Sequence, residues 1–233
     1  MNQHQSAGQS TKDRILDVAE RLFAEHGFGA TSMRAITNEA GVNLAAVNYH
    51  FGSKDGLVRA IFARRLAPMN TERLRRLREL ERRSGGIRLD NLIRAFVGPA
   101  LELSRDEPES GARFVRLLGR SYTEPSQALQ STVRSMYEDV IERFKPAFSA
   151  ALPGLDREEL HWRLYFLVGT LAHCMAGSDM MHLVAASQLS GDLQHELLPR
   201  LVAFLAAGMS APAGTQRAQP PLLATAGHAS PSS

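Results

Sequence analysis

Residues 41–54, GVNLAAVNYHFGSK, decide the fold of this chain. Asn43 can cap a short helix over residues 44–51, because an asparagine side chain accepts a hydrogen bond from a backbone amide in the first helical turn. Val47 and Phe51 are four residues apart, so they share one face of that helix and are expected to pack into a core. The stretch therefore predicts a short helix that presents an asparagine, a tyrosine and a histidine on its outer side.

The residues before this stretch predict two more helices. Apolar residues recur at helical spacing over residues 11–26, and Gly27 stands where a C-cap glycine belongs. Thr31 is the expected N-cap of a second helix over residues 32–40, and Gly41 ends that helix. Two short helices joined by a glycine turn and supported by a longer one form a helix-turn-helix arrangement.

The residues after the stretch predict a long, arginine-rich helix. Ser53 can cap it, and Pro68 is expected to kink or break it because proline removes a backbone hydrogen bond. Residues 64–83 are dense in arginine, and Ser84-Gly85-Gly86 closes the segment. The arginines could extend a phosphate-binding surface or form a solvated face interleaved with glutamates. We favour the solvated face for residues 75–83.

The remainder of the chain is also predicted to be helical, because apolar residues recur at helical spacing and the alternation typical of strands is missing. Asp90 and Asp156 are possible N-caps. Four or five longer helices are expected, at roughly residues 88–105, 109–121, 124–151, 156–177 and 192–207. The predicted fold is all-α, with a flexible arm (1–10), a three-helix domain that contains the helix-turn-helix (11–67), a second helical domain (68–208) and a disordered tail (209–233).

Composition places the chain in the soluble, intracellular class. Cys174 is the single cysteine, so no intrachain disulfide can form. The N-terminal residues contain no apolar core typical of a signal peptide, and no later run is long enough to cross a bilayer, which predicts a cytoplasmic protein. The formal charge of +3 is compatible with a nucleic-acid partner without requiring one.

The short helix over residues 44–51 is suited to reading DNA. The N-terminal end of the second helix of a helix-turn-helix enters the major groove, where asparagine can pair with adenine and apolar groups can meet thymine methyls. Residues near its other end can contact phosphates. Arg34 could contact a base or only cover the helix surface, and the whole segment could be a structural helix; we favour DNA binding. The candidate DNA-binding residues are Arg34, Asn43, Leu44, Ala45, Ala46, Asn48, Tyr49, His50 and Lys54.

The middle helices contain apolar residues that could line a ligand pocket or simply fill the core. The candidate pocket residues are Phe96, Leu103, Phe114, Leu117, Leu118, Met136, Val140, Phe144, Tyr165 and His173. Arg113, Arg116, Arg120, Tyr122 and His173 could meet a polar head group or lie on a solvated face. The spacing of His161, His173 and His182 puts no two on adjacent turns of one helix, so no metal site is expected.

The last two helices could form a surface for self-association. The helix over residues 160–171 is apolar on nearly every side and therefore needs cover all round. The final helix carries a wide apolar stripe. The candidate dimer-interface residues are Leu164, Leu171, Leu197, Leu201, Val202 and Leu205.

The stretches ILDVAERLFAEHGF, TSMRAITNEAGV and VNYHFGSKDGL resemble the DNA-binding domain of the TetR/AcrR family of bacterial repressors. Val47, His50, Phe51 and Lys54 match the family motif. Asn48 departs from it, because the family commonly has a tyrosine there; Tyr49 could supply that tyrosine's phosphate contact. RFVRLLGRSYTEPS, MYEDVIERFKPAF, HWRLYFLVGTLAH and LLPRLVAFLAAGM are similar, more loosely, to the subgroup that senses long-chain fatty acids or their coenzyme A esters.

The resemblance implies a homodimeric repressor that binds a palindromic DNA operator and is released by a small apolar effector, a long-chain acyl compound. It also implies dimerisation through the last two helices. Two other functions stay open. One is a dimeric DNA-binding protein without an effector. The other is an enzyme, which we do not favour because the sequence has no phosphate loop, nucleophile elbow, metal cluster or paired-carboxylate motif; no cofactor is expected.

Overall fold

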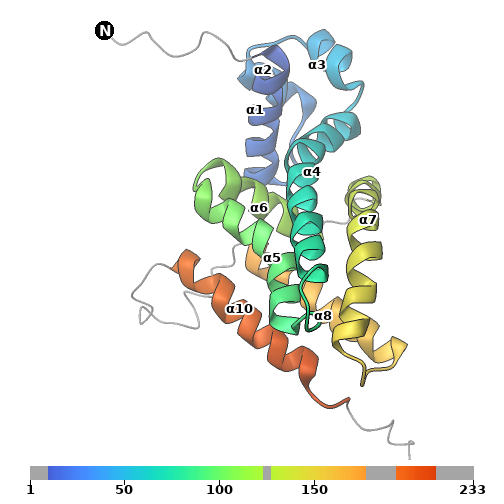
Figure 1. Cartoon of the computed structure of the whole chain (residues 1–233). Helices are drawn as coiled ribbons and strands as arrows, with labels where there is room; N and C mark the ends of the chain where they lie inside the picture. Colours follow the sequence, from blue (N-terminus) through green and yellow to red (C-terminus); the bar gives the residue numbers. More distant parts are fainter. Residues whose placement is uncertain (1–9, 123–126, 177–192, 214–233) are drawn as a thin grey trace, which may run out of the picture.

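The computed structural model describes residues 10–122, 127–176 and 193–213, and these residues form helices and connecting turns with no strand. The prediction of an all-α fold is confirmed. Figure 1 shows three short or medium helices gathered at one end and a long helix, α4, that runs from them along the molecule. The predictions for the arm at residues 1–9, for His182 and for the tail at residues 214–233 lie outside the described part of the chain.

The first three helices are α1 (Thr11–His26), α2 (Met33–Ala40) and α3 (Leu44–Phe51), at the expected positions. The Oδ1 atom of Asn43 accepts the amide of Ala46 at 2.8 Å, which confirms Asn43 as the cap of α3. The predicted cap of α2 was wrong by one residue: the Ser32 hydroxyl accepts the amide of Ala35 at 3.1 Å. Thr31 is buried instead, and its hydroxyl donates to the carbonyl of Gly27 at 2.8 Å, which ties the end of α1 to the start of α2.

The long helix α4 (Lys54–Glu81) begins at its predicted serine cap, where the Ser53 hydroxyl accepts the amide of Gly56 at 3.1 Å. The expected break at Pro68 is absent, since α4 continues through it. Leu66 and Met69, on either side of the proline, are buried in the core, and this packing opposes the cost of about 3 kcal/mol that a proline imposes inside a helix. α4 therefore crosses the expected boundary between residues 67 and 68 as one element.

Within the described ranges, five further helices follow close to the expected positions: α5 (Leu89–Asp106), α6 (Ser110–Ser121), α7 (Gln127–Ala151), α8 (Arg157–Ala176) and α10 (Leu193–Ser210). Asp156 caps α8, because its Oδ1 accepts the amide of Glu159 at 2.8 Å. Asp90 does not cap α5: it lies inside the first turn, where it accepts from the side chain of Arg88 and from the amide of Asn91. The N-cap position of α5 is Arg88, without a side-chain cap.

A single hydrophobic core connects both ends of the molecule. Phe23 and Phe28 pack at a centroid distance of 5.0 Å, Phe28 and Phe62 at 6.2 Å, and Phe62 and Phe114 at 5.7 Å, so a chain of aromatic rings leads from α1 through α4 to α6. α6 lies close against α8: a Cβ atom on Gly119 would stand 2.4 Å from the amide nitrogen of Ala176. The three N-terminal helices are therefore packed directly on the rest of the chain.

Candidate nucleic-acid interface and effector pocket

The turn between α2 and α3 is short and fixed by the backbone. Gly41 adopts φ 62°, a left-handed conformation that favours glycine. The amide of Val42 donates to the carbonyl of Thr37 at 3.0 Å, which closes the end of α2. α3 then buries Val47 completely and packs Phe51 against the core, as predicted. This arrangement leaves the opposite face of α3 in solvent.

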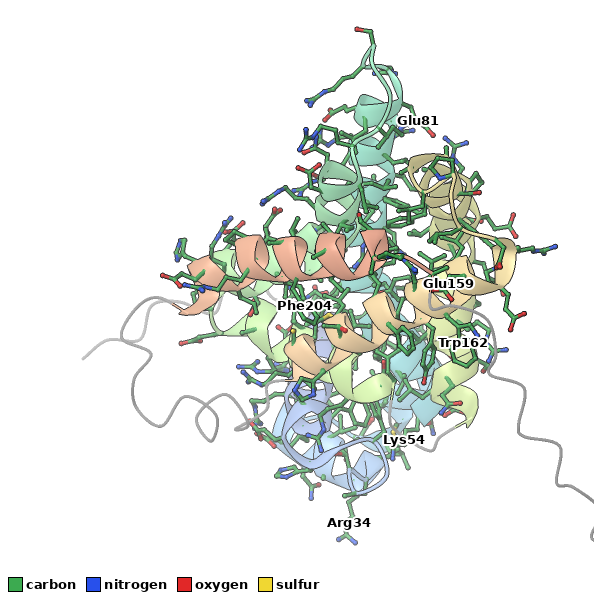
Figure 2. All side chains as sticks on the ribbon, turned by 90° about the horizontal axis from the view of Figure 1, so that it is seen from below. Arg34, Lys54, Glu81, Glu159, Trp162 and Phe204 are labelled. Atoms are coloured by element: carbon green, nitrogen blue, oxygen red, sulfur yellow. The ribbon has the colours of Figure 1, made fainter. Side chains whose placement is uncertain are left out.

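The exposed face of α3 carries most of the candidate DNA-binding residues. Tyr49 is 86% exposed and Leu44 is 51% exposed, both high for large side chains. Figure 2 shows Arg34, from α2, projecting from the same end of the molecule. Ala46 is half-buried, and the other exposed members of the candidate set are Arg34, Asn43, Ala45, Asn48 and His50. The structure thus brings this set together on one surface.

Two candidates have their polar groups engaged within the protein. The Oδ1 of Asn43 serves as the cap of α3, which leaves its amide nitrogen as the group that can face DNA. Lys54 was expected to contribute a phosphate-facing charge. Its Nζ instead donates to the carbonyl of Phe28 and lies 5.8 Å from the ring centre of Phe23. Lys54 thus fastens the start of α4 to the turn after α1, and its expected phosphate contact stays a prediction.

A pocket of about 500 Å³ lies between α4, α5, α7 and α8, with Arg73, Phe96, Tyr137 and Leu171 among its lining residues. A second pocket of about 300 Å³ adjoins it, since Phe96, Ile141 and Val168 line both. The walls are mainly apolar, as is typical of ligand sites in helical proteins. Arg134, Glu138 and Glu142 of α7 are exposed residues along the larger pocket.

Three of the ten candidate pocket residues line these two pockets: Phe96, Phe144 and Tyr165. The other seven line neither pocket, because they pack elsewhere or face solvent: Leu103, Phe114, Leu117, Leu118, Met136, Val140 and His173. Tyr122, a candidate head-group residue, does line the larger pocket. Arg120 does not; it donates to the carbonyl of Ala24 at 2.7 Å and so joins α6 to α1.

The sequence analysis missed Arg73, which is completely buried although it belongs to the arginine-rich segment. Its position could have revealed it, because Leu66, Met69, Arg73 and Leu77 follow the spacing of one buried helix face. The nearby Arg75 and Arg76 lie partly in solvent and pair with Glu72. Hydrogen bonding from Arg75 lowers the pKa of Glu72 to about 2.

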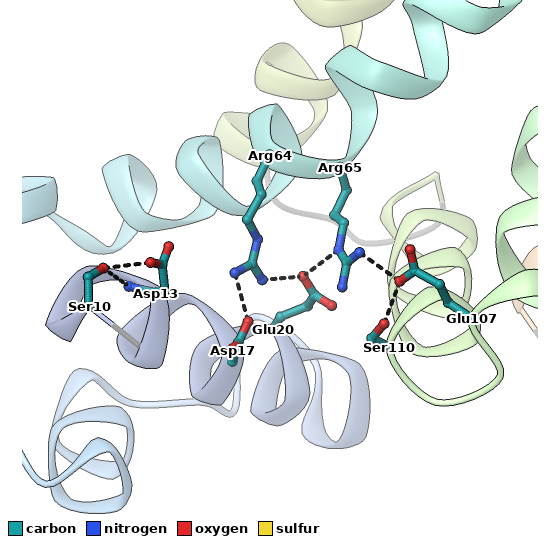
Figure 3. Close-up of polar contacts among 8 residues, drawn as sticks. All are labelled: Ser10, Asp13, Asp17, Glu20, Arg64, Arg65, Glu107 and Ser110. Carbon is teal, nitrogen blue, oxygen red and sulfur yellow. Dashed lines mark hydrogen bonds and ion pairs between the residues drawn. The ribbon is translucent and has the colours of Figure 1, made fainter. Parts of the chain in front are cut away.

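An ion-pair cluster joins three parts of the molecule (Figure 3). Arg64 of α4 contacts Asp17 at 2.7 Å and Glu20 at 2.8 Å, both on α1. Arg65 contacts the same Glu20 oxygen at 3.5 Å and reaches Glu107, just after α5, at 2.9 Å. Glu20 is only 2% exposed. We call these five residues the Glu20 cluster; it ties α4 to α1 on one side and to the α5–α6 turn on the other.

The charges of the Glu20 cluster reinforce one another. Burial opposes the charged form of Arg64, but hydrogen bonds to Glu20 and Asp17 raise its pKa above the ordinary value. A hydrogen bond from Ser110 and the charge of Arg65 lower the pKa of Glu107. Arg64 and Glu107 are therefore ionised at neutral pH. Arg64 and Arg65 take part in this internal cluster and do not form a free phosphate-binding surface.

α8 and α10 carry an exposed apolar face of four large side chains: Trp162, Tyr165, Phe166 and Phe204 are 53, 67, 59 and 69% exposed. Trp162 and Phe166 stack at a centroid distance of 6.1 Å. Trp162 is labelled on α8 and Phe204 on α10 in Figure 2. We call these four residues the aromatic face. The expected all-round cover of α8 is missing within the described chain.

The candidate interface residues must be corrected. Leu171, Leu201, Val202 and Leu205 are at most 5% exposed because the chain already buries them. Leu164 and Leu197 are half-buried against the same core. The apolar stripe of α10 packs against α5, so it is an internal face and a mutation there would disturb the fold. The exposed residues on α10 lie on its other side, where Ala203, Phe204, Ala207 and Gly208 form a stripe.

Residues 10–122, 127–176 and 193–213 hold no group of three histidine, cysteine or carboxylate side chains placed to bind a metal ion. Within the same ranges, no helix combines the length and apolar character that a bilayer crossing requires.

Two family models match the chain. Residues 15–61 match the model of bacterial regulatory proteins of the tetR family, and residues 94–208 match the model of the tetracyclin repressor-like C-terminal domain. The HTH-type transcriptional regulator UidR of Escherichia coli K12 is 38% identical over 61 residues, which are 26% of this chain and 31% of UidR. The match therefore spans less than a third of that curated relative.

Solved structures share the fold over most of the chain. The fatty acid degradation regulator FadR from Bacillus halodurans aligns with a TM-score of 0.61 and 14% identity, covering 87% of this chain and 98% of FadR. The SmeT–triclosan complex aligns with a TM-score of 0.58 and 24% identity, covering 91% of this chain and all (100%) of SmeT. At these identities the likeness extends to the fold alone.

Proposed function

Because the chain belongs to the TetR family of bacterial transcriptional regulators, we propose that it binds operator DNA through α2 and α3 and represses transcription as a homodimer. The observation that carries the proposal is the division of α3 into a buried side, with Val47 fully enclosed, and an exposed side that presents Leu44, Asn48 and Tyr49. A recognition helix needs this division, since one side must be held rigidly while the other reaches base edges and phosphates. We assign DNA binding to residues 11–67 and effector binding and dimerisation to residues 68–208.

Replacement of Tyr49 by phenylalanine tests the docking of α3. We propose that its hydroxyl bonds a phosphate on each half-site, so Tyr49→Phe should weaken operator binding by roughly 10-fold, from two lost bonds of about 1 kcal/mol or less each. The measurement is a mobility shift on the DNA upstream of the protein's own gene. The residue is 86% exposed, so the thermal unfolding midpoint should stay unchanged.

Asn48→Ala is the companion variant, because Asn48 is exposed and has no capping role in α3. Asn43→Ala is less informative, since it also removes the cap of α3, a loss of about 1 kcal/mol in helix stability. Unchanged operator affinity in both Tyr49→Phe and Asn48→Ala would refute the proposed docking.

The effector is proposed to bind in the two adjoining pockets. Their shared apolar walls favour an elongated ligand, and a long-chain acyl compound fits that shape. Structural likeness to a fatty acid degradation regulator and to SmeT bound to triclosan supports a small apolar ligand. The effector can act only through different affinities for the DNA-binding and the released geometry. α4 is the element that can couple the larger pocket to the DNA-binding helix, because it lines that pocket and begins directly after α3.

A mobility-shift titration with acyl compounds of increasing chain length tests this proposal. We expect operator DNA to be released over a limited range of chain lengths, because the pockets have a finite volume. If no chain length changes operator affinity while DNA binding is intact, the effector-independent alternative is favoured.

A further inference from the structure

Arg73 is held in the interior of the protein entirely by neutral groups. Its Nε donates to the carbonyl of Phe96 at 2.8 Å, and its Nη1 donates to the side-chain oxygen of Asn70 at 2.7 Å and to the hydroxyl of Tyr137 at 3.4 Å. The guanidinium carbon lies 5.5 Å from the ring centre of Phe96 and 5.3 Å from that of Tyr137. The guanidinium is therefore fixed in one position.

The charge of Arg73 has no counter-ion among the described residues, and its Nη2 has no hydrogen-bond partner although it is buried. An arginine does not lose its proton in a protein, and a buried cation without a partner is strongly unfavourable. On α4 and α5, Glu72 is paired with Arg75 and Arg76, and Glu102 is paired with Arg76. Glu138 and Glu142 of α7 line the same pocket as Arg73 but are exposed to solvent. Among the described residues, the guanidinium of Arg73 is therefore a buried cation without a paired carboxylate.

Arg73, which carries the unpaired Nη2, lines the larger pocket together with Tyr122 and Tyr137. The hydroxyls of these two tyrosines are hydrogen-bonded to each other, and burial raises the pKa of Tyr122 well above its ordinary value, so Tyr122 stays protonated. One O–H is used between them, which leaves the other able to donate to a bound oxygen. Two donors, a guanidinium and a phenol, thus meet in the lining of a pocket whose walls are mainly apolar and whose charged residues on α7, Arg134, Glu138 and Glu142, are exposed to solvent.

We propose that the effector carries a free carboxylate, which binds the Nη2 of Arg73 and a tyrosine hydroxyl while its apolar body extends past Val168 and Ile141 into the second pocket. This inference rests on the proposed function, since it identifies the chemistry of the effector. A carboxylate matches the planar guanidinium and supplies the missing negative charge. A coenzyme A thioester has no charge at the acyl end, so the free acid is the ligand and the thioester is not.

The experiment compares dodecanoate, its methyl ester and its coenzyme A thioester by isothermal titration calorimetry on the full-length protein. We expect wild type to bind dodecanoate at least ~10-fold more tightly than the methyl ester, as for a hydrogen bond to a charged group. Arg73→Met should bind acid and ester equally. Arg73→Lys, which keeps the charge, should retain part of the preference.

Two controls keep the test independent of folding. Arg76→Met changes an arginine on the same helix that pairs with Glu102 and lies outside both pockets, so it should keep the preference for the acid. Arg73→Met removes an unpaired buried charge, and its thermal midpoint should not fall below that of Arg76→Met.

Equal binding of acid and ester by wild type, undetectable binding of the acid, or unchanged acid binding in Arg73→Met would overturn the inference. A mobility shift run in parallel separates this result from the proposed function. Operator binding that is released by the ester or the thioester would leave the regulator proposal standing and remove only the carboxylate. A wild-type protein that prefers the acid but binds no operator would support the carboxylate proposal and contradict the proposal that the protein is a DNA-binding regulator.

Discussion

Phe204→Glu is expected to give a folded monomer that has lost most of its operator affinity. Phe204 is 69% exposed, so the substitution costs the single chain little. We propose that two chains meet at the aromatic face, and the substitution places a charge in that contact. A dimer binds two half-sites at once, and the second contact raises overall affinity by about 10²–10⁴-fold. We therefore expect the operator affinity of the monomer to be lower than that of the dimer by about 10²–10⁴-fold. Analytical ultracentrifugation and a mobility shift measure the two effects.

Two matched variants separate the interface from the charge change. Phe204→Leu keeps an apolar side chain and should remain dimeric. Ser149→Glu introduces the same charge at an exposed site on α7 and should leave both association and DNA binding unchanged. A Phe204→Glu protein that sediments as a dimer would show that the aromatic face is not where the chains meet.

Phe114→Ala is expected to lower the free energy of unfolding by about 3–5 kcal/mol, the range found when a buried phenylalanine is truncated. Phe114 is 0% exposed and packs edge-on against Phe62, so it joins α6 to α4 at the α6 end of the aromatic chain that starts at α1. Urea denaturation followed by circular dichroism measures the change. The sequence assigned Phe114 to a ligand pocket, and a large loss of stability without ligand would reflect its position in the core.

Tyr49→Ala is the control for that measurement. It removes an aromatic ring of similar size at a position that is 86% exposed, so the free energy of unfolding should change by less than about 0.5 kcal/mol. If both truncations cost the same, burial in this structure does not determine stability at these sites.

The helices could be predicted from the sequence because their ends are marked by local chemistry. Asn43, Ser53 and Asp156 cap helices where expected, since a cap depends only on residues within one turn. Thr31 and Ser32 are adjacent hydroxyl residues, and only the packing of α1 against α2 decides which one caps. The helix break that Pro68 could have caused is absent for a similar reason, because burial of the surrounding helix opposes the tendency of proline to end it.

The candidate site was predictable where one helix determines it and not where several meet. The outward side of α3 follows from the burial of Val47 and Phe51 alone. On α10, by contrast, both sides carry apolar residues, and periodicity does not tell which side faces α5. The predicted dimer interface therefore named the stripe that the structure buries and not the exposed side that carries Phe204. The burial of Arg73 was not predicted, because it belongs to an arginine-rich segment in which the neighbouring arginines lie in solvent.

The Glu20 cluster has a consequence for how sharply the protein could respond. One nearly buried carboxylate accepts from two consecutive arginines of α4, while those arginines also hold Asp17 and Glu107. A rotation of α4 cannot release one neighbour gradually, because partly separated positions would leave charged groups inside without partners. We therefore expect two discrete settings of α4 with few molecules between them, so that a rising effector concentration changes how many molecules have switched and not how far each one has moved.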